Sequence, residues 1–219
     1  MHDVFDYAKY YIKQGLDTPR NTFDGNMKIQ KLLVLANLIS LAVRGVELYK
    51  EEILAFQQGC VIEPVRLRYK NDYDNLLNES IYFNPNFTQD IINILELNSS
   101  LFGKLSAREL SDVNHSFDFW KDAYNNSIQQ NGYKNKTKAI ITLASITKEL
   151  DKIKNIISEY NISLAENRSI EYINGIEFRY SPDDIILTDD LIDELFEFSL
   201  SADERSYNIY FDEGELVIY

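Results

Sequence analysis

The amino-acid sequence predicts a mainly α-helical protein, in which a compact helical domain over residues 1–160 precedes a small α+β appendage over residues 161–219. Apolar residues recur at three- and four-residue spacing through the first range, as on one face of a helix. In the second range, alternating runs surround an Asn-Gly pair, as in a β-hairpin. The charge changes at the same place: residues 1–160 hold 20 acidic and 19 basic residues (−1), and residues 161–219 hold 15 and 3 (−12).

The first helix is predicted over residues 4–12. The most apolar segment, residues 27–45, has apolar side chains around most of the helix circumference, which predicts a central helix packed among others and ended by Gly45. Three cations interrupt it: Lys28, Lys31 and Arg44. The uncharged stretches between them are too short for a membrane span, so a buried helix is the favoured interpretation.

Four more amphipathic helices are predicted over residues 88–103, 106–113, 119–128 and 137–160, the last one long and continuous. Ser106 and Glu109 have the spacing of a capping box, in which each side chain bonds the backbone N–H of the other residue. Neither an internal repeat nor a low-complexity linker interrupts the series. A single packed helical domain is therefore expected.

The appendage is predicted to contain two β-hairpins and one helix. Asn174-Gly175 lies between two alternating runs and favours a type I′ turn. A second hairpin is expected over residues 207–219, turning through Asp212 to Gly214. Between them, residues 188–200 form an acidic amphipathic segment, which predicts a short helix.

The stretch QQGCVIEPV, residues 57–65, holds the only cysteine of the chain. A nucleophilic thiolate needs a nearby base, and the chain offers only His2, next to the terminus, and His115. Nothing in the sequence brings either to Cys60. The favoured interpretation is a turn containing a small buried thiol, and a catalytic role for Cys60 is the lesser alternative.

Composition argues against several classes of protein. One cysteine excludes an internal disulfide and a Cys-based zinc cluster, and with the acidic, aromatic start of the chain it favours the cytoplasm. Phosphate-loop, zinc-protease and nucleophile-elbow motifs do not occur, so neither an enzymatic activity nor a cofactor is expected. The pairs Asp183-Asp184 and Asp189-Asp190 suggest a metal site only weakly, because adjacent carboxylates in a strand point to opposite faces.

The acidic appendage instead favours a partner protein with a basic surface, and it disfavours nucleic acid and anionic membranes. Solubility is the competing explanation for these charges. The carboxylates expected to face such a partner are Asp183, Asp184, Asp189, Asp190, Asp193, Glu194 and Glu197.

Two blocks of the sequence carry a resemblance to a known family. In the first, a helix with a Lys-Leu pair leads to a glycine, an acidic stretch and a Gly-x-Val-x-x-Pro turn. Its residues are Lys31, Leu32, Gly45, Leu48, Gly59, Val61 and Pro64. The second block is a Leu-Ser-x-x-x-Leu segment followed by a histidine and a tryptophan. Its residues are Leu105, Ser106, Leu110, His115 and Trp120.

In these blocks, residues 3–159 resemble the antitoxin SocA-like family, also called the Panacea domain. Cys60 departs from the pattern where the family commonly has proline, and Asn114 and Phe119 depart at its Thr and Pro positions. The resemblance implies an antitoxin that keeps a cognate protein toxin inactive by binding it. It does not extend to the acidic appendage.

Two other functions stay open at this stage. The protein is alternatively a phage or mobile-element counter-defence protein whose acidic surface inhibits a nuclease or CRISPR-type effector. A DNA-binding autorepressor is less favoured, because no predicted helix has a dense basic stripe.

The family-like residues also have structural interpretations. Gly59 and Pro64 are expected to direct the backbone. Lys31 reaches a partner's carboxylate or extends its ammonium to water beside the apolar helix. His115 is a pH-responsive contact or, with more weight, a hydrogen-bonded residue at a helix junction. Trp120 anchors a partner or, more commonly for a lone tryptophan, packs in the core.

Overall fold

A computed structural model describes residues 2–129, 132–166, 168–212 and 214–219. The protein is mainly α-helical, with one three-stranded and one four-stranded sheet. It divides into two compact units, residues 1–156 and 157–219. Helix α9, Leu150–Glu166, begins in the first unit and ends in the second, so the predicted boundary at residue 160 falls inside a helix.

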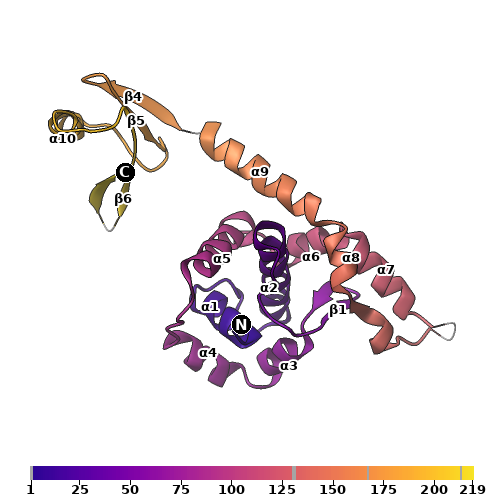
Figure 1. Cartoon of the computed structure of the whole chain (residues 1–219). Helices are drawn as coiled ribbons and strands as arrows, with labels where there is room; N and C mark the ends of the chain where they lie inside the picture. The colour runs from indigo at the N-terminus through magenta and orange to yellow at the C-terminus, as the bar shows by residue number, and fades with distance from the viewer. Residues whose placement is uncertain (1, 130–131, 167, 213) are drawn as a thin grey trace. The chain divides into compact units, whose positions relative to one another are not determined.

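Helix α2, Phe23–Arg44, is the centre of the helical unit. Figure 1 shows it between α5 (Gln89–Phe102) and α6 (Ala107–His115), and it also contacts α1 (Val4–Lys13). Thr22 caps its start, and Gly45, with a φ of 70°, ends it as predicted. Helix α2 is long and apolar enough to cross a membrane, but 72% of its most apolar 18-residue stretch is buried within the protein. Its apolar character is that of a core helix.

The segment predicted as a turn forms a small sheet and the start of a helix, which corrects that prediction. Strand β1 (Ile53–Phe56) pairs with β2 (Gly59–Val61) on one side and β3 (Ile140–Ile141) on the other, all antiparallel. Helix α3 (Glu63–Asn71) follows with Pro64 in its first turn, a position where a missing N–H costs nothing. Helix α4 (Tyr73–Ile81) comes next. Neither α3 nor α4 is predicted by the sequence.

The long helix predicted over residues 137–160 is wrong in its first half. The chain instead forms a 3₁₀ turn η1 (Lys136–Ala139), strand β3 and the short helix α8 (Leu143–Thr147) before α9 begins at Leu150. Two β-branched residues in β3 pair with β1, and Thr142 then caps α8. Tertiary pairing therefore overrides the helical pattern here. Helix α7 (Asp118–Ser127) and the capping box at the start of α6 agree with prediction.

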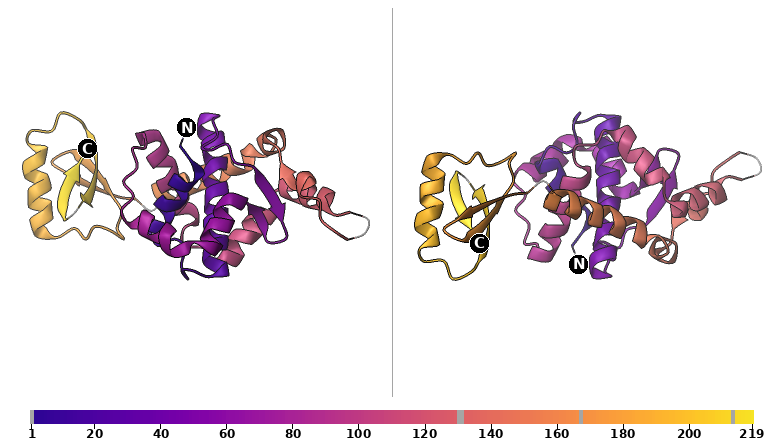
Figure 2. Two further views of the ribbon diagram at one scale, coloured as in Figure 1. Left: turned by 90° about the horizontal axis from the view of Figure 1, so that it is seen from below. Right: turned by 90° about the horizontal axis from the view of Figure 1, so that it is seen from above.

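The second unit has the order hairpin, helix, hairpin. Strands β4 (Ser169–Ile173) and β5 (Ile176–Tyr180) precede α10 (Asp189–Ser199), and β6 (Ser206–Asp212) and β7 (Glu215–Ile218) follow it. The two predicted hairpins join through a parallel β5–β6 pair into one sheet, which α10 makes possible as the crossover. Figure 2 shows α10 along one face of this sheet, where Leu191 and Leu195 pack in a core around Phe178.

The two turns of this sheet compare differently with prediction. Asn174 and Gly175 have φ angles of 51° and 82°, as a type I′ turn requires, so the first hairpin is confirmed. Strands β6 and β7 pair from Asp212 and Glu215 onward. The second predicted turn includes residue 213, which lies outside the described residues.

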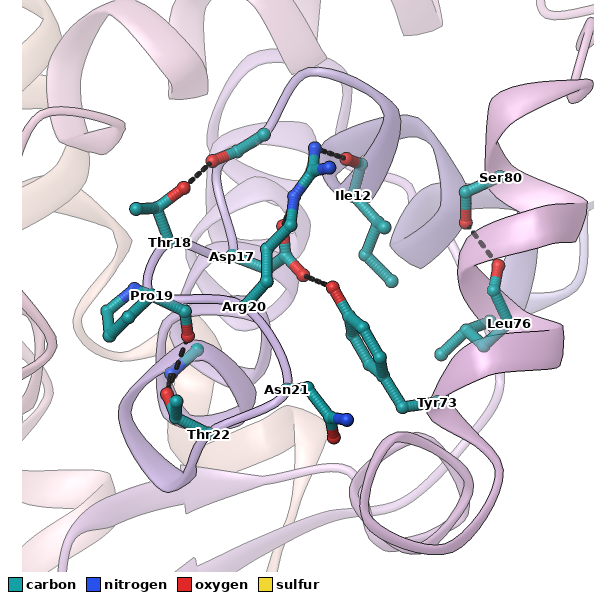
Figure 3. A network of polar contacts seen from close by, with 12 residues as sticks. Ile12, Asp17, Thr18, Pro19, Arg20, Asn21, Thr22, Tyr73, Leu76 and Ser80 are labelled. Carbon is teal, nitrogen blue, oxygen red and sulfur yellow. Dashed lines mark hydrogen bonds and ion pairs between the residues drawn. The ribbon is translucent and has the colours of Figure 1, made fainter.

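A buried carboxylate organises the connection between α1 and α2. Asp17 is fully buried, and its Oδ2 accepts hydrogen bonds from the hydroxyls of Tyr69 (3.0 Å) and Tyr73 (2.6 Å). Its Oδ1 lies 3.3 Å from Arg20 Nε. Figure 3 shows the Tyr73 hydroxyl meeting Asp17 while Arg20 extends across to the carbonyl of Ile12. The connection is therefore tied to α3 and α4, and Tyr69 is held in place beside the site described next.

Candidate functional site

A cavity of about 440 Å³ opens where the start of α2, the β1–β2 turn and α3 meet. Lys31 and Gln30 line it from α2, Gln57 and Gln58 from the turn, and Arg66 from α3. A cavity of this volume is large enough for a small ligand. Two of the family-like residues, Lys31 and Val61, also line it.

Lys31 is the most unusual residue of this site, because it is only 1% exposed. Its Nζ donates a hydrogen bond to the carbonyl oxygen of Cys60 over 2.9 Å. Burial lowers the pKa of Lys31 from 10.5 to about 8. The expectation that its ammonium extends to water is therefore wrong: the amine lies inside the protein, against the wall of the cavity.

Gly59 makes room for this buried amine. A Cβ atom at Gly59 would lie 2.9 Å from Lys31 Cε and 3.1 Å from both Lys31 Nζ and Asn114 Cβ. Its φ of 99° also belongs to the region that disfavours residues with a side chain. Gly59 therefore has a second role besides directing the backbone: the absence of a side chain leaves space for Lys31 to pack against strand β2.

Cys60 is buried and sits in strand β2 opposite Ala55. Its backbone N–H donates to Asn114 Oδ1 (3.3 Å), while Asn114 Nδ2 donates to the carbonyl of Leu110 (3.0 Å). Burial raises the pKa of the Cys60 thiol to about 12, although the Lys31 charge opposes this. The thiol is therefore protonated at neutral pH, which supports a structural role over a nucleophilic one.

We expect Cys60 to resist thiol reagents in the folded protein. A disulfide reagent such as dithionitrobenzoate should label it only after unfolding, because the thiol is inaccessible and protonated. Cys60→Ala and Cys60→Ser should keep partner binding and lower the free energy of unfolding by about 1 kcal/mol. Rapid labelling of the native protein, or lost binding by a folded Cys60→Ser variant, would contradict this assignment.

His115 and Trp120 form a stack beside the β1–β2 hairpin. Their ring centroids are 3.9 Å apart, and Tyr124 continues the stack at 5.2 Å from Trp120. Trp120 Nε1 donates to the carbonyl oxygen of Phe56 over 2.9 Å. Burial, and then the Lys31 charge, lower the pKa of His115, which disfavours the charged ring. Both side chains are half-buried and hold α6 and α7 to the hairpin.

The remaining family-like residues differ in their positions. Leu32 is fully buried in the core, Val61 is 5% exposed and lines the cavity, and Pro64 is exposed on α3. The sequence did not identify Arg66 or Gln30 as residues of this site. Gln30 Oε1 accepts a hydrogen bond from the backbone N–H of Ile62 over 2.8 Å. No motif marks these two residues, because their roles depend on the fold. Asn114 stood out only as a departure from the family pattern.

The seven predicted carboxylates of the appendage are all exposed. Five lie on α10, where Asp189, Asp193 and Glu197 repeat every four residues and share one side of the helix. Next to this row, Ile192, Phe196 and Leu200 are 36%, 44% and 62% exposed. In the described part of the chain, no group of three or more His, Cys, Asp or Glu side chains is placed to hold a metal ion.

No family model, curated protein sequence or solved structure matches this chain. The resemblance to the SocA-like antitoxins therefore stays a prediction, based on the residues named above.

Lys31 makes the stability of the protein depend on pH in a predictable direction. Its pKa is about 8 in the folded protein against an ordinary 10.5. Between these values the unfolded chain holds more protons, so the contribution of Lys31 to stability rises as the pH rises through this window and is lost as the pH falls through 8. From pH 7 to pH 9 the gain is on the order of 1 kcal/mol.

This effect is isolated by comparison with Lys31→Met. We expect the free energy of unfolding of the wild type to rise by on the order of 1 kcal/mol relative to the variant between pH 7 and pH 9. The raised pKa values of Cys60 and the buried tyrosines lower the stability of the protein as the pH becomes alkaline. Subtracting the free energy of unfolding of the variant from that of the wild type cancels these contributions. Urea denaturation at both pH values measures it. Parallel pH profiles of the two proteins would exclude a strongly shifted Lys31.

Proposed function

We propose that this protein is a non-enzymatic, cytoplasmic inhibitor of the antitoxin class, which neutralises a cognate protein toxin by direct binding. The observation that carries the proposal is the outward side of α10. There, a row of carboxylates runs beside the exposed apolar residues Ile192, Phe196 and Leu200. This surface suits a partner with an apolar patch bordered by lysine and arginine.

The helical unit supports the same function in a different way. Its one thiol is buried and protonated, and its half-buried histidine is stacked on Trp120 with a lowered pKa. These groups act within the packing of the family-like segments. We assign that unit the role of the Panacea-like domain, and the acidic unit the role of steering a basic toxin.

The function is tested by growth. The reading frame next to the gene for this chain is expressed in bacteria alone and together with the chain. We expect the neighbour to arrest growth alone and the pair to grow normally, with a complex that elutes as one species. A neighbour that is harmless, or a toxicity that this protein does not relieve, would contradict the antitoxin proposal.

The acidic row predicts how the complex forms. Neutralising Asp189, Asp193 and Glu197 as Asn, Asn and Gln should slow association with the toxin about tenfold at low salt, with little change in dissociation. Raising the ionic strength should slow the wild type toward the variant, because the Debye length falls to about 8 Å in physiological salt. Stopped-flow mixing or surface plasmon resonance gives both rates.

A matched control removes three exposed carboxylates from the helical unit, as Asp74→Asn, Glu96→Gln and Asp122→Asn. It changes the net charge by the same amount and should leave the association rate within about twofold. Equal effects of the two triple variants would show that only net charge matters, and would remove α10 from the proposed interface.

The counter-defence alternative depends on the same carboxylates, since an acidic surface can occupy the nucleic-acid groove of a nuclease. It makes a separate demand on the protein: competition with DNA or RNA for a nuclease at low salt. We rank it second because the exposed apolar residues beside the row have no counterpart in a phosphate backbone.

A further inference from the structure

The cavity beside Lys31 differs in charge from the rest of this acidic protein. Three cationic side chains reach its wall: Lys31, Arg66 and Lys70. Of the described residues that line it, none is Asp or Glu, although the chain has 35 acidic residues. A concave site with cationic walls attracts anions and concentrates them.

Two of these cations carry buried donors that the protein leaves unused. The Lys31 ammonium has three protons, and among the described residues it donates one hydrogen bond, to the Cys60 carbonyl. Arg66 Nε is buried and has no hydrogen-bond acceptor in the part of the chain that the structure describes. Buried donors without partners are uncommon in folded proteins, because each costs the free energy of its lost hydration. Both residues line the cavity, so two incompletely paired cations lie at its wall.

The neighbouring carboxylate does not neutralise this wall. Glu63 accepts a hydrogen bond from the Arg66 guanidinium over 3.3 Å and also pairs with Lys136, so one acid is shared by two bases. Lys70 is exposed and makes no ion pair within the described part of the chain. The cavity therefore keeps a positive charge when it is empty.

The rest of the wall is apolar or carries neutral amides. Phe23, Met27 and Phe56 supply apolar surface, and the Arg66 guanidinium lies 5.7 Å from the centre of the Phe56 ring. Phe23 is 71% exposed at the start of α2, which is an unusual position for a phenylalanine. Gln30, Gln57 and Asn26 add side chains that can both donate and accept hydrogen bonds.

We propose that this cavity binds a small organic anion, with a carboxylate or phosphate held between Lys31 and Arg66 and an aromatic body packed on Phe23, Met27 and Phe56. The volume of about 440 Å³ suits a ligand the size of a nucleoside monophosphate. The site belongs to the helical unit and is independent of the α10 surface assigned to the toxin.

The test is calorimetric titration of the full chain with matched pairs of probes. Adenosine and uridine monophosphates are compared with their neutral nucleosides, and phenylacetate is compared with phenylacetamide. We expect at least one anion to bind with a Kd below about 1 mM and at least tenfold more tightly than its neutral counterpart. The phosphate and carboxylate pairs show which anion the site takes. Absence of anion binding, or equal binding of the neutral probes, would overturn the proposal.

Variants locate the site on the protein. Lys31→Met should weaken binding of the anion at least tenfold, because Lys31 is a buried cation. Lys70→Gln should weaken binding only about threefold, because Lys70 is exposed and its charge is screened by water. Lys104→Gln, an exposed cation that does not line the cavity, should leave it unchanged. If Lys31→Met fails to fold, Arg66→Gln replaces it. Undiminished binding by folded Lys31→Met or Arg66→Gln would place the anion elsewhere and refute the assignment.

Discussion

Replacement of Gly25 by alanine is expected to destabilise the protein by about 3 kcal/mol. At an ordinary helical position the same change stabilises by about 0.5–1 kcal/mol, since alanine is the better helix former. In α2, however, the added Cβ would overlap the carbonyl oxygen of Asp17 and lie 2.5 Å from that of Pro19. The Tyr69 hydroxyl would be 2.6 Å away. Two of these atoms are backbone and cannot rotate aside.

Gly45, which ends the same helix, is the matched control. Its φ is 70°, so alanine is strained there, but among the described residues no atom beyond its chain neighbours lies within 4 Å of the added Cβ. Gly45→Ala should therefore cost only about 1 kcal/mol. Denaturant unfolding of the three proteins gives the comparison. A Gly25→Ala variant as stable as the wild type would show that the connection between α1 and α2 is not packed against this helix as described.

Loss of the Asp17 carboxylate is the second change expected to have a large effect. Asp17→Ala should lower the free energy of unfolding by about 3–4 kcal/mol, because two buried tyrosine hydroxyls lose a charged acceptor at once. The pKa of Tyr69 and that of Tyr73 are raised by burial and by this carboxylate, so both remain protonated donors. Among the described residues, Asp17 is the only carboxylate that accepts a hydrogen bond from either hydroxyl.

Single changes around Asp17 separate its contributions. Arg20→Gln should cost less than about 1 kcal/mol, since the arginine side chain is 45% exposed and its ion pair is screened by water. Tyr73→Phe removes one hydrogen bond to a charged group and should cost about 1.5–3 kcal/mol. An Asp17→Ala loss no larger than that of Arg20→Gln would mean that the ion pair, and not the tyrosine bonds, explains the buried carboxylate.

The candidate site could be predicted only in part from the sequence. The family-like spacing drew attention to Lys31, Gly59 and Val61. The structure places Lys31 and Val61 in the wall of one cavity and Gly59 against Lys31. The burial of Lys31 could not be read from the chain, because its acceptor is the carbonyl of a residue 29 positions later. The importance of Arg66 likewise comes from the fold, because its buried Nε has no hydrogen-bond acceptor among the described residues. Such properties belong to the assembled fold.

Features that depend on neighbouring residues could be predicted from the amino-acid sequence. Helical periodicity marks α1, α2, α5, α6, α7 and α10, a capping box starts α6, and Asn-Gly turns the first hairpin of the acidic unit. These are local preferences, repeated often enough to outweigh alternatives. The concentration of charge after residue 160 is likewise a property of composition alone.

The other features depend on contacts between segments that are distant in the chain. Strand β3 has two residues, too few for a pattern, and exists because Ile140 and Ile141 pair with Leu54 and Ile53 far earlier in the chain. The parallel β5–β6 pair depends on α10 packing across the sheet, which neither hairpin encodes. Pairing and burial between distant segments have no local signature, because their free energy is gained only when the whole chain closes. The cavity beside Lys31 is a product of that closure.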